Sequence, residues 1–230
     1  MPVLDHEYHV GLPARNRRAL MAIGGRRRAR RALARAAKAV LPDRWQAQQT
    51  GWCCGPASAR IALTCRGIYL SQDQLIREIG TDEDGTDYVG LITPILTSHT
   101  KAQHWAYYPK AGAVALVWQN IVASIDAGFA LVVNIVSDPG VVRAPGYPWS
   151  TIWHYVCVIG YDPVTREVIV ADPANFSGNS HWRMKIDDFV RMITWQSKGY
   201  TGRPVGGNLL GLSDTDLAGV RANLAQLGPT

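Results

Sequence analysis

One stretch constrains the fold more than any other part of the chain, because it has the pattern of two strands joined by a tight turn. "WHYVCVIGYDPVTREVIVADPA", residues 153–174, places β-branched and aromatic residues on either side of an Asp-Pro pair. Such residues favour strands, and Asp-Pro favours a turn. Folding the stretch about Val164 brings His154 within diagonal reach of Asp172. The sequence therefore predicts an antiparallel hairpin with an imidazole and a carboxylate near each other.

Helical patterns precede most of the strand patterns. A chain of 230 residues, of which 47% are hydrophobic, can bury a sizeable core. A further buried strand is expected at 129–136, just before the hairpin. Helices first and antiparallel strands later predict an α+β body. The expected helices cover residues 56–67, 72–79 with Ser71 as cap and Gly80 as terminator, 88–98, 117–127 and 185–193.

The positive charge is concentrated near the N-terminus. Residues 15–44 hold eleven Arg and Lys residues and one acid, a net charge of +10, which leaves −4 for the rest of a chain whose total is +6. Helices are expected from Pro13 to Ile23 and from about Arg26 to Val40, the second one amphipathic. One interpretation is a solvated face whose alanine side packs on the body. The other is attraction to a polyanion such as a cell-wall polymer, anionic lipid or nucleic acid. Without aromatic interleaving, no specific nucleic-acid recognition is expected.

Three segments follow from these patterns. Residues 1–44 form a basic helical arm, residues 45–205 an α+β domain, and residues 206–230 a C-terminal amphipathic helix or the stump of a linker. No apolar run reaches the roughly 18 residues that a membrane span needs. The residues after the arginine-rich stretch lack the apolar region of an export signal. We therefore expect neither a transmembrane segment nor a signal peptide.

The stretch "QQTGWCCGPASARIALTCRG", residues 48–67, raises the question of what its cysteines do. A helix starting at Pro56 leaves Cys54 at its positive end, where free N–H groups and the partial charge favour a thiolate. Cys65 falls on the buried face of that helix, and Cys53 points elsewhere and is expected to pack. Adjacent cysteines lack the spacing by which two sulfurs hold one zinc ion. No metal site is expected.

A thiolate that acts as a nucleophile needs a base and a group that orients the base. Among the six histidines, His154 lies inside a strand, and Asp172 ends a hydrophobic strand where an unpaired carboxylate would be unfavourable. The alternative for His154 is a hydrogen-bonded histidine of the core. Asp162, before the turn proline, is expected to cap the turn. The pattern favours Cys54 as nucleophile, His154 as base and Asp172 as orienting group.

These residues resemble a known family. "QQTGWCCGPAS" is similar to the active-site segment of the bacteriocin-processing, double-glycine leader peptidase family and its papain-like relatives. The hairpin is similar to the His strand and the Asp-Pro strand end of the same family. The resemblance implies a papain-like fold and assigns Cys54, His154 and Asp172 the same three roles. It adds Gln48 as an oxyanion donor beside the Cys54 backbone N–H, with Gln49 as the alternative register. It implies no cofactor.

Free-standing relatives occur as protease modules of actinobacteriophage endolysins, and the basic arm and C-terminal helix are similar to theirs. The resemblance thus implies a lysin that hydrolyses peptidoglycan peptides, stays in the host cytoplasm until a holin releases it, and then acts at the cell wall. The basic arm is expected to meet an anionic wall polymer. Two other hypotheses stay open: a leader or maturation protease acting on a protein, and a non-enzymatic phage structural or wall-binding module. Cys53 departs from the family pattern, which has an acid or an aromatic residue there.

Overall fold

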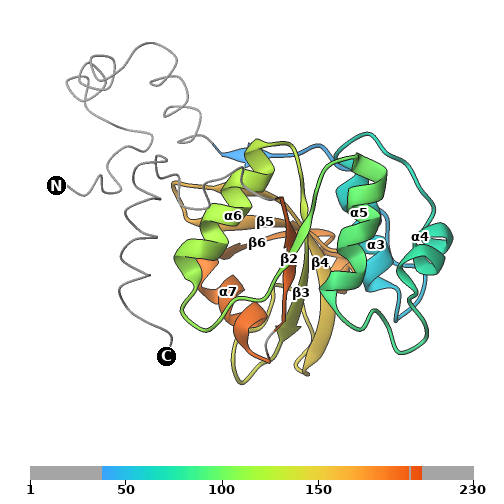
Figure 1. The fold of residues 1–230 in the computed structure, drawn as a ribbon. Coiled ribbons are helices and arrows are strands. Elements are labelled where there is room, and N and C mark those ends of the chain that lie inside the picture. The colour runs from blue at the N-terminus through green and yellow to red at the C-terminus, as the bar shows by residue number, and fades with distance from the viewer. Residues whose placement is uncertain (1–37, 197, 204–230) are drawn as a thin grey trace, which may run out of the picture.

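The computed structural model describes residues 38–196 and 198–203, and this part of the chain is built around an antiparallel sheet (Figure 1). Within these residues the sheet has seven strands in the order β2-β7-β3-β4-β5-β6, with β1 beside β4. The α+β prediction is confirmed. The strands are β1 (Ala39–Val40), β2 (Trp105–Tyr107), β3 (Leu131–Ser137), β4 (Ile152–Asp162), β5 (Glu167–Ala171), β6 (His181–Lys185) and β7 (Tyr200–Gly202).

Helices cover both faces of the sheet. Figure 1 shows α3, α4 and α5 on one side, and α6 and α7 on the other. Successive residues of a strand point to opposite faces, so β3, which is buried along its whole length, contributes to both cores. Val132 packs with α3, whereas Val133 packs with α6 and α7. The helices are α3 (Cys54–Thr64), α4 (Gln72–Ile79), η2 (Val89–Leu91), α5 (Ile92–Thr100), α6 (Val114–Asp126), η3 (Phe176–Gly178) and α7 (Ile186–Thr194).

The predicted hairpin is formed by β4 and β5. Cys157 pairs with Ala171, which is the register obtained by folding about Val164. A bulge between Val158 and Gly160 shifts the pairs nearest the turn by one residue. The Asp162 carboxylate accepts hydrogen bonds from the backbone N–H groups of the next turn residues, as expected for a turn cap. The hairpin end that carries His154 therefore has the predicted register.

The N-terminal end of the described chain differs from the prediction. Residues 39–40 were expected to end a helix, but they form β1, which pairs with Tyr161 and Gly160 of β4. The reason lies in strand length: β3 pairs with β4 only from Ile152 to Val158, so the far end of the same β4 edge is free for β1. A Cβ on Gly160 would lie 2.4 Å from the Ala39 carbonyl oxygen, so this approach requires glycine.

The predicted helices are found with shifted ends. Ser71 caps α4 by accepting a hydrogen bond from the Gln74 N–H, and Gly80 ends α4 with a left-handed backbone, as predicted. The helix expected at 88–98 is split into η2 and α5, and the one expected at 117–127 is α6, which starts three residues earlier. The expected helices of the basic arm before residue 38 and the C-terminal helix lie outside the described residues.

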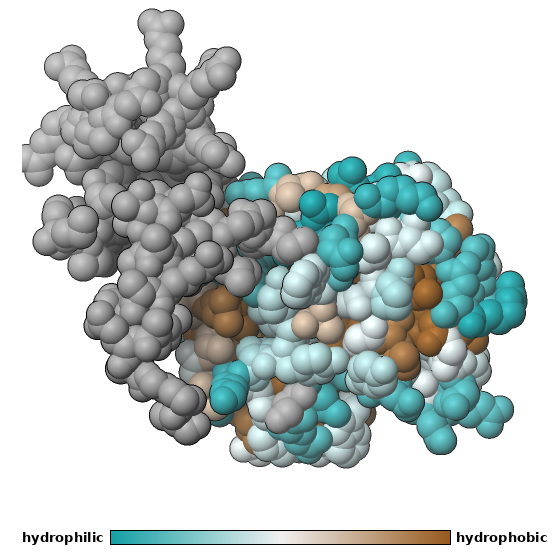
Figure 2. Space-filling model, viewed as in Figure 1, coloured by the Kyte–Doolittle hydropathy of each residue, from teal (hydrophilic) through white to brown (hydrophobic). Residues whose placement is uncertain are grey.

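Helix α4 has one buried face and one exposed face, as an amphipathic helix does. Leu75 and Ile79 are buried, while Asp73, Arg77 and Glu78 are exposed. Figure 2 shows hydrophilic residues at this edge of the molecule and hydrophobic ones toward the centre of the same face. In the part of the chain that the structure describes, no helix has the length and apolar character needed to cross a membrane.

Candidate active site

Cys54 is the first residue of α3, where the first N–H groups of a helix have no partner within the helix. The glycine that follows it has a packing role. A Cβ on Gly55 would lie 2.3 Å from the Thr86 side-chain oxygen, and Thr86 is itself hydrogen-bonded to Thr81 at 2.7 Å. Gly55 therefore lets the 81–86 segment pack against the start of α3. Pro56 has the fixed φ that suits the first turn of a helix.

One hydrogen bond ties the helix of the thiol to the strand of the imidazole. The Ser58 hydroxyl, one turn after Cys54, donates to the Tyr155 carbonyl at 2.9 Å. Tyr155 directly follows His154 in β4 and packs in the same apolar cluster as Cys54. The bond fixes α3 along β4, and this holds the Cys54 side chain at the His154 end of the strand.

The Cys54 thiol is 8% exposed and interacts with His154. Burial by itself raises the pKa of a thiol, but the hydrogen bond and charge of His154 outweigh it, so the pKa of Cys54 is lowered from its ordinary value. Hydrogen bonds from the Tyr155 and Gly55 backbone act in the same direction. The site therefore favours a thiolate at Cys54.

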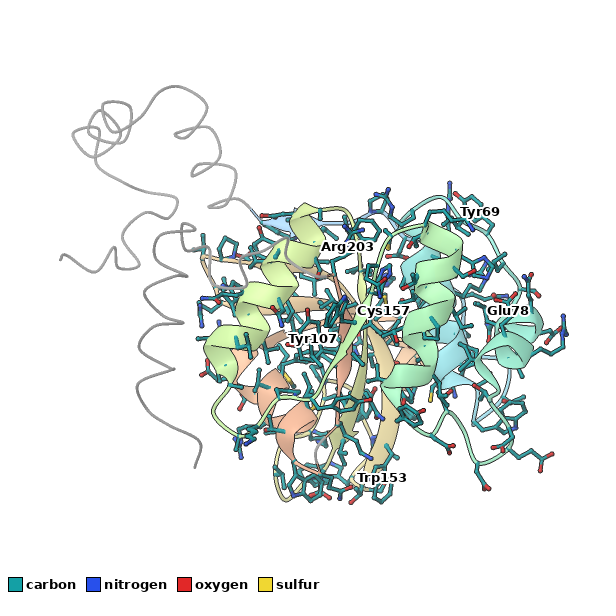
Figure 3. All side chains as sticks on the ribbon, in the orientation of Figure 1. Tyr69, Glu78, Tyr107, Trp153, Cys157 and Arg203 are labelled. Atoms are coloured by element: carbon teal, nitrogen blue, oxygen red, sulfur yellow. The ribbon has the colours of Figure 1, made fainter. Side chains whose placement is uncertain are left out.

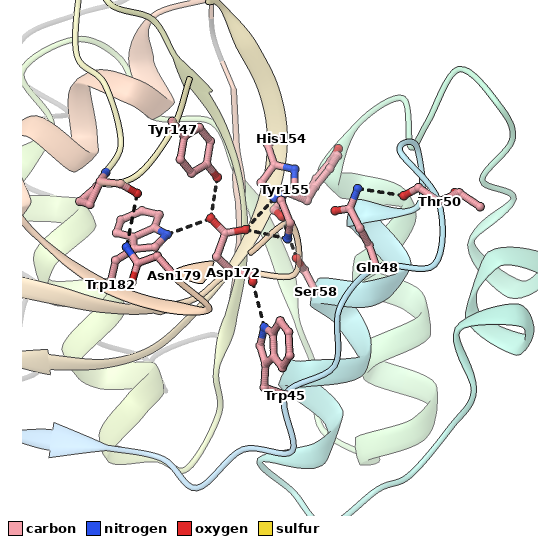
Figure 4. Close-up of polar contacts among 12 residues, drawn as sticks. Trp45, Gln48, Thr50, Ser58, Tyr147, His154, Tyr155, Asp172, Asn179 and Trp182 are labelled. Carbon is pink, nitrogen blue, oxygen red and sulfur yellow. Dashed lines mark hydrogen bonds and ion pairs between the residues drawn. The ribbon is translucent and has the colours of Figure 1, made fainter. Parts of the chain in front are cut away.

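His154 bridges the thiol and a buried carboxylate. Its Nε2 lies 2.9 Å from Asp172 Oδ1 (Figure 4), which leaves the other ring nitrogen, Nδ1, for the hydrogen bond with Cys54. Burial lowers the pKa of an imidazole, but the hydrogen bonds and charges of Asp172 and Cys54 raise the pKa of His154 to about 10. Burial raises the pKa of Asp172, and the bonds and charge of His154 lower it further than burial raises it. These directions favour a thiolate, an imidazolium and a carboxylate in series.

The loop before α3 is held to the end of β5. The Gln48 backbone N–H donates to the Pro173 carbonyl at 3.0 Å. Its side-chain Nε2 donates to the Thr50 carbonyl at 2.9 Å, and its Oε1 is buried without a hydrogen-bond partner. The Gln49 side chain is exposed. The structure thus brings Cys54, His154 and Asp172 together, and it places the Gln48 amide on Thr50 (Figure 4).

The family follows from a comparison of the sequence with known families. The model of the Peptidase_C39 like family matches residues 41–202, most of the chain. The chain belongs to this family. It is therefore a cysteine peptidase by family, and its Cys54 thiol, His154 imidazole and Asp172 carboxylate are in contact.

Solved structures include similar chains. A C39-like peptidase from Bacillus anthracis is 15% identical to this C39-like peptidase, with a TM-score of 0.49, and the match covers 73% of this chain and 98% of that one. The peptidase domain of Streptococcus ComA, a bifunctional ABC transporter, is 15% identical, with a TM-score of 0.46, over 69% and 97%. A double glycine motif protease from an AMS/PCAT transporter is 12% identical, with a TM-score of 0.47, over 72% and 95%. No curated protein matches the chain.

The other three cysteines of this C39-like peptidase are in different surroundings. Cys53 is fully buried, where its sulfur accepts the Thr50 N–H at 3.2 Å and contacts the Gln72 side-chain oxygen at 3.5 Å. Burial raises the pKa of Cys65 to about 12, and burial also raises that of Cys157, which Figure 3 shows in the interior. Within residues 38–196 and 198–203, no three His, Cys, Asp or Glu side chains converge as metal ligands.

Sequence reasoning missed the groups that surround the carboxylate. Asp172 is fully buried, and its side chain accepts hydrogen bonds from the Tyr147 hydroxyl at 2.7 Å and the Trp182 indole N–H at 2.8 Å. The Trp45 indole N–H donates to the Asp172 backbone carbonyl at 2.9 Å. The available signal was general: a buried carboxylate needs donors, and Tyr and Trp supply them when buried.

Proposed function

We propose that Cys54, His154 and Asp172 hydrolyse peptide bonds as nucleophile, acid–base catalyst and orienting group. The observation that carries this proposal is the interaction of one imidazole with both a thiol of lowered pKa and a fully buried carboxylate. A nucleophile, a base and a third group that orients the base are the working parts of this type of catalysis. The chain's membership of a cysteine peptidase family supports the same roles.

The reaction has two halves. The Cys54 thiolate attacks the carbonyl carbon of the scissile bond, and the carbonyl oxygen becomes an oxyanion. His154 gives a proton to the leaving amine as the C–N bond breaks, which leaves a thioester on Cys54. A water molecule then transfers a proton to His154 and attacks the thioester carbon. The acid product leaves, and the thiolate and imidazolium are restored.

The oxyanion requires hydrogen-bond donors. We assign this role to the Cys54 backbone N–H, which has no partner within α3 because Cys54 is its first residue, and to the side-chain amide of Gln48. That amide has two N–H bonds, of which one donates to the Thr50 carbonyl, so the second is free for an oxyanion. The Gln48 backbone bond to Pro173 supports this role, because it fixes the loop beside the strand end that carries Asp172.

For the substrate we propose stem or cross-link peptides of peptidoglycan, cleaved as a phage endolysin does. The support is the net charge of +10 in residues 15–44, which suits an anionic wall polymer. Lys38 and Arg44, which belong to this segment and to the described residues, are both exposed. In this proposal the protein is held in the host cytoplasm until a holin releases it to the wall. A leader or maturation protease and a non-enzymatic wall-binding module are the competing proposals.

The test uses purified peptidoglycan from an actinobacterium. Wild-type protein and Cys53→Ser are expected to release peptide fragments that mass spectrometry identifies by their new amino and carboxyl ends, whereas Cys54→Ala releases none. Cys53→Ser is the matched control, because it changes the neighbouring thiol. Intact peptidoglycan together with cleavage of a synthetic double-glycine leader peptide would favour the leader protease. Cleavage of neither substrate would refute both the peptidoglycan and the leader-peptide proposals.

A further inference from the structure

The Asp172 carboxylate is fully buried, and its hydrogen-bond capacity is filled. Oδ1 accepts from His154 Nε2 and from the Ala174 backbone N–H, both at 2.9 Å. Oδ2 accepts from the Tyr147 hydroxyl at 2.7 Å and from the Trp182 indole N–H at 2.8 Å. Figure 4 shows these last two donors converging on one side of the carboxylate, with His154 on the other side.

We propose that Tyr147 and Trp182 are positioning residues that stabilise the ionised form of Asp172 and fix its plane so that Oδ1 faces His154. This inference rests on the proposed function, because it assigns the two residues to the catalytic pair named there. Neither touches a substrate in this assignment, because Tyr147 is 2% and Trp182 4% exposed. They act on the reaction through Asp172.

The chemistry of the two donors favours a charged acceptor. An indole N–H can only donate, so Trp182 requires an acceptor at Oδ2 in every state of the site. Burial and the adjacent Asp172 charge raise the pKa of Tyr147 well above its ordinary value, so the hydroxyl keeps its proton and donates as well. Hydrogen bonds to an ionised group are stronger than neutral ones. Both bonds therefore lower the pKa of Asp172 in addition to the effect of His154.

Aromatic rings also enclose the pair. The Tyr147 ring lies 4.5 Å from the Phe176 ring, and Phe176 makes an edge contact with the His154 ring at 6.2 Å between centroids. The Ser177 hydroxyl donates to the backbone of the loop that carries Tyr147, at 3.0 Å. The loops after β3 and β5 are thus joined over the His154–Asp172 pair. Exclusion of water strengthens the attraction within that pair.

The test removes one donor at a time and keeps an aromatic side chain at each position. Tyr147→Phe and Trp182→Phe are compared with wild type and with Tyr161→Phe, a matched control that removes a hydroxyl bonded to the Asp126 carboxylate at 2.7 Å elsewhere on β4. The titration of Asp172 is followed by NMR of the carboxyl carbon, with Asp172→Asn to assign the signal. Steady-state hydrolysis of a soluble peptide is measured on the same proteins.

Loss of either donor is expected to raise the titration midpoint of Asp172 by up to about one pH unit, because each bond stabilises the ionised form. The turnover number kcat should fall about tenfold while KM stays the same, because the binding surface is unchanged. Tyr161→Phe should match wild type in both. Tyr147→His is expected to restore part of what Tyr147→Phe loses, because its ring N–H supplies the donor that phenylalanine lacks.

An Asp172 midpoint that is unchanged in both Tyr147→Phe and Trp182→Phe would overturn the inference, as would an equal shift in Tyr161→Phe. If Tyr147→Phe fails to fold, the midpoint in Trp182→Phe decides by the same criterion. The NMR titration needs no substrate. A wild-type protein that hydrolyses no peptide would therefore refute the proposed function, while the titration still decides the role of the two donors.

Discussion

Replacing Asp172 with asparagine is expected to lower both stability and turnover, because an amide cannot take over the four hydrogen bonds of this carboxylate. The Ala174 backbone N–H points at Oδ1 and the Trp182 indole N–H points at Oδ2. Neither donor can reverse its direction. Whichever way the amide is oriented, its NH₂ group faces one of these N–H groups, and a buried donor is left without an acceptor.

The size of the effect follows from the buried contacts. An unsatisfied buried donor costs about 1–3 kcal/mol. Breaking a buried ion pair by removing one partner costs roughly 3–5 kcal/mol, and the similar shape of asparagine places Asp172→Asn at the lower end. We expect the free energy of unfolding to fall by about 3 kcal/mol. Turnover should fall roughly 10²–10⁴-fold, because the amide disfavours the imidazolium. KM should change little, since Asp172 is fully buried.

The stability difference should depend on pH. The pKa of His154 is raised from 6.5 to about 10, so its stabilising effect is complete below the lower value and is lost as the pH rises through the higher one. The pKa of Asp172 is lowered from 3.8, so its effect is present above that value and is lost as the pH falls through the lowered one. Both effects are fully present only between pH 3.8 and pH 6.5, so the difference in stability between wild type and Asp172→Asn should be largest there.

Urea unfolding followed by tryptophan fluorescence at several pH values measures this difference, and hydrolysis of a soluble peptide measures turnover. Asp126→Asn is the control, because Asp126 is exposed and accepts a bond from the Tyr161 hydroxyl. Its free energy of unfolding should fall by less than about 1 kcal/mol. A difference for Asp172→Asn within about 0.5 kcal/mol of wild type at neutral pH, or one that does not change with pH, would refute the reasoning.

Three other variants test separate parts of the structure. Gly55→Ala should destabilise the fold by about 1–3 kcal/mol in urea, because its Cβ would lie 2.3 Å from the Thr86 oxygen, whereas Gly51→Ala, with no atom within 4 Å, should not. His154→Ala should lose most of the turnover and slow alkylation of the active-site thiol at neutral pH; an unchanged alkylation rate would contradict the pairing. Deleting residues 1–37, which keeps β1, should leave soluble-peptide hydrolysis near wild type but weaken salt-sensitive retention on cell walls; unchanged retention would exclude the arm as an anion-binding segment.

The hairpin could be predicted because its determinants are local. The β-branched runs and the Asp-Pro turn define both strands and the axis about which they fold. The bulge between Val158 and Gly160 could not be predicted. It shifts only the pairs near the turn, and the pairs beyond it, such as Cys157 with Ala171, are symmetric about Val164 as predicted. The position of β1 was not predictable in the same way. It depends on the difference in length between β3 and β4, which single segments do not reveal.

The hydrogen-bond donors around Asp172 likewise include one that is local in the sequence and two that come from distant segments. Because Pro173 has no N–H, Ala174 is the first residue that can donate a backbone bond to the carboxylate, and it does so at 2.9 Å. That bond is local, because donor and acceptor are two residues apart in the sequence, as in other Asp turns. Tyr147 and Trp182 reach the same carboxylate from segments 25 and 10 residues away. Their convergence depends on how β3, β4, β5 and β6 lie beside one another, so the sequence could state the need for donors at Oδ2 but not which residues supply them.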